Sequence, residues 1–195
     1  YALPYGLKNN WINYQQSQAK RWRLENINGY RNNDLAQAYR LYTLALAGKP
    51  VKSAMNRLRE SNKLSISAAW RLALTYQLLG NANVAKSIVK DKATRVSPYR
   101  ELGYTYGSNH RDQAMIIEAL TKMGLKNKAA SSVKELSEVL SSDRWMSTQT
   151  TAFCLKAISD FIGESGKSNS LNYSCTFNGR SDSQITNQVI DQKDL

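Results

Sequence analysis

The sequence offers few side chains for covalent or metal chemistry. It contains two cysteines, Cys154 and Cys175, and one histidine, His110, in 195 residues. Neither cysteine belongs to a C-x-x-C motif, and a single histidine is too few for a zinc site, so we expect no metal. Cys154 lies in an apolar run without a neighbour that would lower the pKa of a thiol, which predicts a buried small hydrophobic residue. His110 stands at a predicted helix start, where we expect an exposed polar residue.

The acidic residues form no recognisable catalytic motif. Only 15 Asp and Glu residues occur, and we expect most of them on polar helix faces, as at Glu60, Glu118, Glu135 and Glu138. The chain lacks the D-x-D-D cluster of terpene cyclases, the zinc-binding Asp, Cys and His set of prenyltransferases, a Gly-rich phosphate loop and a G-x-S-x-G elbow. The sequence alone does not exclude a pair of carboxylates placed for glycoside hydrolysis. We therefore expect neither an enzyme nor a bound cofactor.

Two short polar clusters each precede an apolar helical run. The first is Gly107-Ser108-Asn109, which lies before the pair Arg111-Asp112, and the second is Ser147-Thr148, which leads into Gln149. Serine before a helix is a typical cap, and an aspartate in the first turn is favoured by the helix dipole. We expect Arg111 to bridge to a neighbouring loop, and Gln149 to bond a buried backbone group or to line the end of a ring. We interpret both residues as structural.

Apolar-rich and amphipathic helical segments alternate along the chain. The apolar-rich segments must be covered on more than one side, which predicts an inner layer at residues 35–47, 66–79, 112–123 and 148–162. The amphipathic segments are predicted to lie outside, at residues 51–60, 82–90 and 127–141. A further helix is predicted at residues 11–24, and loops at residues 1–10 and 91–108. Eight helices in this order are typical of stacked αα-hairpins.

Two architectures fit such an array: a closed double ring, the α/α toroid, and an open solenoid of the tetratricopeptide kind. The segment AWRLALTYQLLGNANVAKSIV resembles a tetratricopeptide repeat. The repeat length is irregular, however, the loop at residues 91–108 is long, and no proline closes each unit. We therefore predict an all-α fold, a partial α/α toroid of stacked helical hairpins, with a short β segment at the C-terminus.

The composition changes after Gly163. The stretch GESGKSNS is typical of a linker, and the residues after it alternate in part, with a hairpin turn signal at Asn178-Gly179. We predict that residues 171–195 are extended and that they are the first strands of a following β-domain. The expected domains are residues 1–164 and residues 165–195.

The charge of the chain is strongly positive, at +12. The Lys and Arg residues are scattered, and their densest groups fall on polar helix faces, so we expect a solvated surface and no nucleic acid partner. A hydrophobic content of 42% with 22% charged residues indicates a globular chain. No apolar run approaches the roughly 20 residues of a membrane span, so we expect no direct insertion into a membrane.

Two segments carry a resemblance to a known family. YGSNHRDQA (106–114), followed by WMSTQTTAFCLKAI (145–158), resembles the C-terminal half of the thioester domain of the α-2-macroglobulin and complement family, especially its bacterial members. In that family a Y/G-S-T-Q-x-T segment opens one of the last inner helices of an α/α toroid. The residues that the resemblance marks as a structural motif are Tyr106, Gly107, Ser108, Arg111, Asp112, Trp145, Ser147, Thr148, Gln149 and Thr151.

The chemistry of that family is an internal thioester between the Cys and Gln of a C-x-E-Q motif. This chain lacks the motif, since neither Cys154 nor Cys175 precedes a Glu-Gln pair. The segment LENINGYRNNDLAQA (24–38) resembles the region just after a histidine that redirects acyl transfer toward hydroxyls in some members. No histidine stands at the corresponding place, residues 22–25, so the resemblance implies that a thioester upstream would favour amines.

The resemblance implies a function through a parent protein. That parent would be a bacterial α-2-macroglobulin-like, broad-spectrum endopeptidase inhibitor that traps proteases in bacterial defence. As a lipoprotein it would be anchored through its N-terminus at the periplasmic or outer surface. Residues 1–164 would be the C-terminal portion of its thioester domain, structural and without a thioester, in contact with other domains of the parent chain. The alternative interpretation is a tetratricopeptide-like protein-binding module without covalent chemistry, and an enzyme built on the ring comes third.

Overall fold

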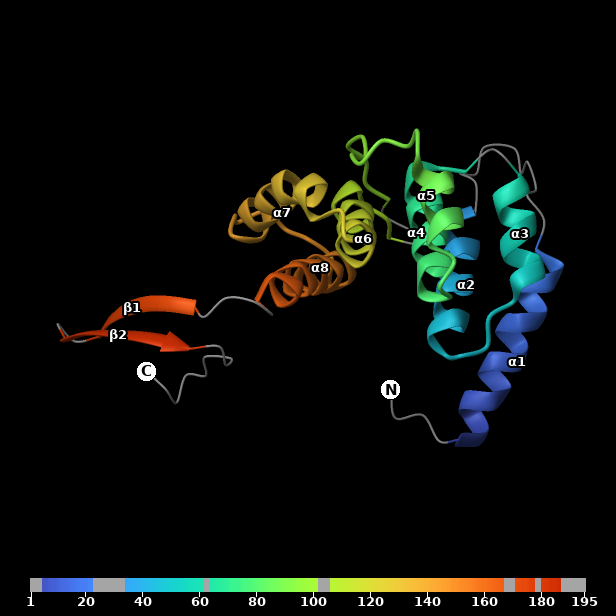
Figure 1. Cartoon of the computed structure of the whole chain (residues 1–195), viewed down its shortest axis with the longest axis horizontal. Helices are drawn as coiled ribbons and strands as arrows, with labels where there is room; N and C mark the ends of the chain where they lie inside the picture. Colours follow the sequence, from blue (N-terminus) through green and yellow to red (C-terminus); the bar gives the residue numbers. More distant parts are fainter. Residues whose placement is uncertain are drawn as a thin grey trace.

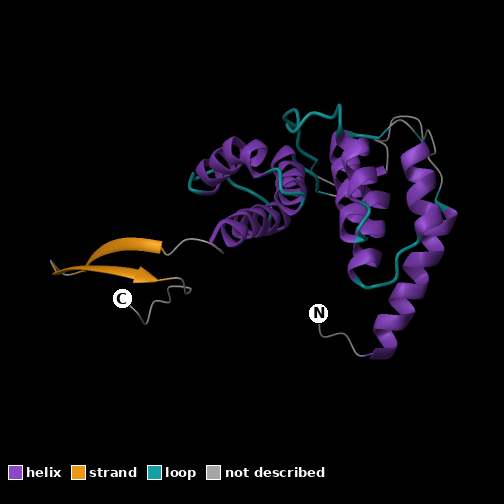
Figure 2. Cartoon of the chain, viewed as in Figure 1, coloured by secondary structure: helices purple, strands orange, loops and turns teal. Residues whose placement is uncertain are grey.

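The computed structural model describes residues 5–22, 34–61, 64–101, 106–166, 171–177 and 180–186, with side chains between residues 8 and 163 of these ranges. In this part of the chain, eight helices pack against one another in an all-α domain (Figures 1 and 2). The helices are α1 (Tyr5–Arg21), α2 (Asp34–Leu46), α3 (Lys52–Glu60), α4 (Ile66–Leu78), α5 (Ala82–Val89), α6 (Asn109–Lys122), α7 (Lys126–Leu140) and α8 (Thr148–Gly166). An antiparallel pair of strands follows, β1 (Leu171–Phe177) and β2 (Arg180–Thr186), in which Leu171 pairs with Thr186 and Phe177 with Arg180.

Helices α2, α4, α6 and α8 form one layer, in which each helix packs against the next. These are the segments with apolar residues on more than one face, and α4 and α6 are buried along most of their length. Helix α3 packs on α2 and α4, α5 on α4, and α7 on α6 and α8, while α1 covers α2 and α3. The order of contacts agrees with the predicted alternation of inner and outer helices.

Three of the inner helices end in the same way. Gly48, Gly80 and Gly124 follow α2, α4 and α6 with φ angles of 70°, 78° and 74°, a left-handed conformation that glycine adopts without steric cost. The amide of the residue after each glycine donates to a carbonyl of the last helical turn, as from Lys49 to Leu44 at 2.9 Å and from Leu125 to Leu120 at 2.8 Å. This pair of features is the Schellman motif, and it turns the chain from the inner to the outer layer.

The inner layer is strongly curved. Tyr39 on α2 and Phe153 on α8 make an edge-to-face contact with ring centroids 6.0 Å apart, although α4 and α6 lie between these helices in the layer. In a flat layer, three steps of 8–10 Å would separate the axes of α2 and α8 by roughly 24–30 Å. Figure 1 shows the change of direction, because α2 to α5 run up and down the view and α6 to α8 are turned away from that direction.

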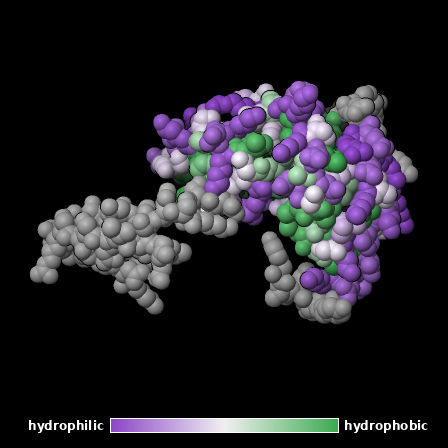
Figure 3. Space-filling view, viewed as in Figure 1, coloured by the Kyte–Doolittle hydropathy of each residue, from purple (hydrophilic) through white to green (hydrophobic). Residues whose placement is uncertain are grey.

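The surface over α2 and α4 is partly apolar. Figure 3 shows hydrophobic residues gathered where these two helices lie, whereas the neighbouring surface is mostly hydrophilic. Tyr39, Leu46 and Leu78 are the large apolar side chains of α2 and α4 that are exposed. The inner layer thus has both a buried face and an accessible apolar one.

The structure corrects several predicted boundaries. Helix α1 begins at Tyr5, inside the segment predicted as a loop at residues 1–10. Helix α6 begins at Asn109 and not at residue 112, because the side chain of Ser108 caps it. Helix α8 continues to Gly166, beyond the predicted end at residue 162. The described strands agree with an extended tail, and its last residues, 187–195, lie outside the described part of the chain.

Candidate functional site

The N-terminal ends of the inner helices meet at one end of the layer. Asp34, the first residue of α2, is 1% exposed, and its carboxylate accepts from the amides of Leu35 at 2.7 Å and Ser65 at 2.6 Å. Ser65 is the N-cap of α4, and its hydroxyl accepts from the amide of Ala68 at 3.3 Å. Burial raises the pKa of Asp34 above its ordinary value, although the bonds from Ser65 oppose this shift.

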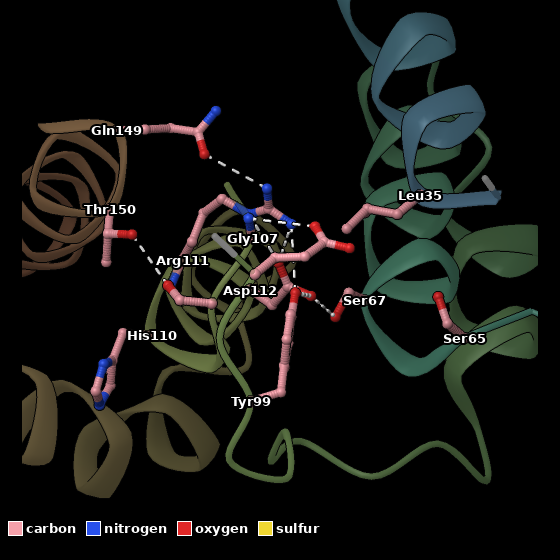
Figure 4. Close-up of polar contacts among 12 residues, drawn as sticks. Leu35, Ser65, Ser67, Tyr99, Gly107, His110, Arg111, Asp112, Gln149 and Thr150 are labelled. Carbon is pink, nitrogen blue, oxygen red and sulfur yellow. Dashed lines mark hydrogen bonds and ion pairs between the residues drawn. The ribbon is translucent and has the colours of Figure 1, made fainter. Parts of the chain in front are cut away.

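Asp112 continues this connection from α4 to α6. Its carboxylate accepts from the hydroxyls of Ser67 at 2.9 Å and Tyr99 at 2.8 Å, and from Nε and Nη2 of Arg111 at 2.9 and 2.8 Å (Figure 4). Both members of the Arg111–Asp112 ion pair are buried, with side-chain exposures of 7% and 6%. Burial and the negative charge of Asp112 raise the pKa of Tyr99, so this hydroxyl stays protonated and donates.

A third set of contacts joins α6 to α8. The Oγ atom of Ser108 accepts from the amide of Arg111 at 3.1 Å and lies 3.0 Å from Oγ1 of Thr150, which is buried. The Oγ atom of Ser147 accepts from the amide of Thr150 at 3.2 Å and caps α8. Nη1 of Arg111 also donates to Oε1 of Gln149 at 3.4 Å. We call the residues in these three sets of contacts the rim cluster: Asp34, Ser65, Ser67, Tyr99, Ser108, Arg111, Asp112, Ser147, Gln149 and Thr150.

The rim cluster brings together the two segments that the sequence singled out. Arg111 reaches Tyr99 in the loop before α6, as expected, with 3.4 Å between Nη2 and the hydroxyl. Gln149 is exposed, and its described bond is to the Arg111 side chain and not to a buried backbone group. Gly107 is buried against the cluster, since a Cβ there would lie 2.9 Å from Nη2 of Arg111.

The remaining residues of the predicted motif lie outside this cluster. Tyr106 and Trp145 are 59% and 70% exposed, so neither contributes to the core. Thr148 is exposed at the first turn of α8, and the hydroxyl of Thr151 donates to the carbonyl of Ser147 at 3.2 Å. His110 is half-buried, which corrects its expected exposure.

A second buried polar site connects all four inner helices through one carboxylate. Glu118 on α6 accepts from Nη1 of Arg71 on α4 at 2.7 Å, from the hydroxyl of Tyr42 on α2 at 2.8 Å and from Nζ of Lys156 on α8 at 2.8 Å. Burial alone would raise the pKa of Glu118, but the charges of Arg71 and Lys156 outweigh it and lower the pKa to about 2. Lys156 also donates to Asp160 at 2.7 Å. We call this group the Glu118 network.

The sequence did not indicate this network. Glu118 was predicted on a polar helix face, and that prediction is wrong, since it is 3% exposed. Arg71 is fully buried, and its guanidinium lies over the rings of Tyr42 and Tyr39 at 4.5 and 5.5 Å. Its Nε and Nη2 atoms have no hydrogen-bond acceptor in the described part of the chain, and the aromatic faces add a favourable electrostatic contact to the ion pair with Glu118. The sequence does contain one hint of this pair: Arg71 lies within the apolar run 66–79, and Glu118 lies within the apolar run 112–123.

The polar groups of these two sites bond one another across neighbouring helices. Cys154 is a free thiol with no exposed surface, as expected, and burial raises its pKa to about 12, which keeps it protonated and unreactive. The Cys175 side chain lies outside those that the structure describes. In the described ranges, no group of three or more His, Cys, Asp or Glu side chains could hold a metal ion. None of the helices described is long and apolar enough to cross a membrane.

No protein-family model, no curated protein and no solved structure matches this chain.

Proposed function

We propose that this chain is a non-reactive portion of the thioester-type helical domain of a bacterial α-2-macroglobulin-like inhibitor, one that traps proteases. One observation carries the proposal. The two segments that resemble this family are separated in sequence, yet they meet in space, through Arg111 and Gln149 and through Ser108 and Thr150. Residues that define one structural joint are expected to recur together, so their joint occurrence in the sequence favours a shared architecture over chance similarity.

The curvature of the inner layer also supports this proposal. An α/α toroid requires inner helices that turn around an axis, and the contact between Tyr39 and Phe153 requires such a turn within four inner helices. We therefore propose a partial α/α toroid, which β1 and β2 would follow as the first strands of a β-domain. A periplasmic or outer-surface location with a lipid anchor on the parent chain belongs to the same proposal.

The role of these residues in the parent would be to form part of a shell. The acyl donor of a thioester is a Gln joined to a Cys, and Cys154 precedes Leu155 and is buried in the inner layer. The fixed charges of the rim cluster and the Glu118 network are paired internally, which stiffens the helical layer without providing a nucleophile. Proteases and the other domains of the parent are the partners that this proposal implies.

Two measurements test the proposal. The chain alone should gain no mass after incubation with methylamine and should not inhibit proteases. The complete gene product should protect a large protein substrate from an added protease while a small peptide substrate is still cleaved, because an enclosed protease stays accessible to small molecules. A methylamine adduct on the chain alone, or a complete product that leaves both substrates equally cleaved, would contradict the proposal.

The alternative is a helical-repeat module that binds another protein without covalent chemistry. The exposed aromatic side chains Tyr106 and Trp145 favour it, because large exposed aromatic groups are typical of binding surfaces. In that case the complete product would protect neither substrate, and the chain alone would bind a partner reversibly.

A further inference from the structure

A pocket of about 320 Å³ lies beside the rim cluster. It is bounded by residues 99–101 and 106–110, by the end of α7 and by the segment that leads into α8. Its walls include the apolar or aromatic side chains of Tyr106, Val139, Trp145 and Met146. This volume is at the lower end of the roughly 300–1,000 Å³ of small-ligand sites, and it suits one bulky side chain.

Two arginines beside this pocket have no acidic partner among the residues that the structure describes. Arg100 and Arg144 are exposed, both line the pocket, and neither forms an ion pair within the described residues. The guanidinium of Arg100 lies 4.5 Å from the ring centroid of Trp145. Arg71 and Arg111, by contrast, each bond a carboxylate within 3 Å. The two pocket arginines are therefore available to a carboxylate from another molecule.

Other titratable groups near the pocket include Glu101, Asp143 and His110. Glu101 lines the pocket, but it faces the rim, where its Oε2 accepts from the amide of Gly107 at 3.4 Å. Asp143 is adjacent in sequence to Arg144, yet the described contacts include no ion pair between them. His110 also lines the pocket, and burial together with the charge of Arg144 lowers its pKa, so this ring is neutral at pH 7.

The backbone presents Tyr106 in an unusual conformation. Its φ angle is 50°, a left-handed value that is rare for a bulky residue. Two backbone hydrogen bonds join the residues on either side of Tyr106, from the amide of Glu101 to the carbonyl of Gly107 at 2.7 Å and from the amide of Asn109 to the carbonyl of Tyr99 at 3.1 Å. Strain of this kind is kept at binding and active sites more often than elsewhere.

We propose that this pocket binds an acidic peptide segment of a partner protein. A bulky apolar side chain of that segment would enter between Tyr106 and Trp145, and carboxylates on either side of it would pair with Arg100 and Arg144. Bidentate pairing with a carboxylate suits a planar guanidinium, and an aromatic wall suits an apolar side chain. A nucleic acid would require a longer row of cations, whereas here two arginines without an ion pair among the described residues lie beside apolar walls. This inference is independent of the proposed function.

Fluorescence anisotropy with the whole 195-residue chain tests this site. The probe is a short fluorescein-labelled peptide in which glutamates flank a phenylalanine. We expect saturable binding that weakens about three- to tenfold in Arg100→Gln and in Arg144→Gln, and about tenfold or more in Trp145→Ala, from the loss of charge-assisted bonds and of the aromatic wall. Peptides with glutamine for glutamate, or alanine for phenylalanine, should bind more weakly.

The matched control is Arg95→Gln. Arg95 belongs to the same loop, is exposed and pairs with Glu135 outside the pocket, so this variant loses the same charge. Circular dichroism should show unchanged helix content in all four variants, since the replaced side chains are exposed. The proposal is overturned if the peptide does not bind, or if Arg95→Gln weakens binding as much as Arg144→Gln does. It is also overturned if a single-stranded oligonucleotide binds more tightly than the peptide and does so equally in Trp145→Ala.

Discussion

Two arginine–aromatic contacts in this molecule have the same distance and opposite surroundings. The guanidinium of Arg71 lies 4.5 Å from the ring centroid of Tyr42, and that of Arg100 lies 4.5 Å from the ring centroid of Trp145. Arg71 is fully buried and bonds Glu118, whereas Arg100 is exposed and has no carboxylate among the described residues. The contact distance is thus the same whether the arginine holds helices together or faces solvent.

Burial and pairing separate the two cases. A buried guanidinium without a counter-charge is costly, so Arg71 depends on Glu118. An exposed guanidinium keeps its hydration, so Arg100 needs no partner inside the chain. The comparison shows that an arginine stacked on a ring indicates a role only when the position of the nearest carboxylate is also known.

The largest effect should come from breaking the buried contact. Glu118→Gln leaves Arg71 buried without a counter-charge, which we expect to cost about 3–5 kcal/mol of unfolding free energy. Urea denaturation followed by circular dichroism measures this loss. The control is Glu135→Gln, the same replacement in a surface pair with side-chain exposures of 60% and 53%, which we expect to cost less than about 1 kcal/mol. Similar losses of unfolding free energy in Glu118→Gln and Glu135→Gln would contradict the expected difference between the buried and the exposed ion pair.

Acid should weaken the buried site. The pKa of Glu118 is lowered from 4.5 to about 2, so its contribution is fully present above pH 4.5 and is lost as the pH falls through about 2. The difference corresponds to roughly 3 kcal/mol of unfolding free energy. Urea midpoints measured over this pH range should fall more steeply in the wild type than in Glu118→Gln, which has no carboxyl group to protonate. Parallel curves would show that Glu118 does not account for the acid sensitivity.

A methyl group added at a glycine should have a smaller effect, and the sign of the effect should depend on the site. In Gly107→Ala, the new Cβ would lie 2.9 Å from Nη2 of Arg111 and 3.1 Å from the Tyr99 hydroxyl, which we expect to cost about 1–3 kcal/mol. In Gly163→Ala, the Cβ would meet no atom within 4 Å, and alanine should stabilise α8 by about 0.5–1 kcal/mol. Thermal melting of both variants measures the difference. An increase in the melting temperature of Gly107→Ala would mean that the side chains of the rim cluster can move to make room for the methyl group without a loss of stability.

The smallest effect on stability should come from the exposed contact itself. Trp145→Ala should change the unfolding free energy by no more than about 0.5 kcal/mol, because this side chain is 70% exposed. The matched replacement, Trp70→Ala, should cost about 3–5 kcal/mol, because Trp70 is 2% exposed and donates to the carbonyl of Ala93 at 2.8 Å. Urea denaturation of both variants compares them. A large loss of unfolding free energy in Trp145→Ala would show that the exposed ring contributes to the stability of the domain.

Local features of the sequence were sufficient to predict the inner helices and the residues at which they end. The inner segments are apolar on several faces, and Gly48, Gly80 and Gly124 mark their ends, so the alternation could be predicted from residue type alone. Helix α1 was missed at its start because Pro4 and Gly6 favour a loop, although a proline next to a helix start is compatible with the helix. Gly6 lies within α1, where the rest of the helix outweighs its low propensity.

Partners distant in the sequence could not be predicted in this way. Glu118 and Arg71 are 47 residues apart, and periodicity does not indicate which residues of two apolar helices face each other. The contact of Arg111 with Gln149, 38 residues away, could not be predicted for the same reason. The pocket could not be predicted either, because it depends on how three separate segments meet, and because Trp145 is a residue type usually expected in a core.

The rim cluster has a consequence for cooperativity. In stacked helical repeats, stability is approximately the sum of a term for each repeat and a term for each interface between neighbours. Here the interface between α2 and α4 includes the buried carboxylate of Asp34, which accepts from Ser65 at the start of α4. The interface between α4 and α6 includes the buried carboxylate of Asp112, which accepts from Ser67 on α4. Separating two repeats would break bonds to charged groups, so the interface terms are large. The helices should therefore unfold as one unit and not fray one repeat at a time from an end.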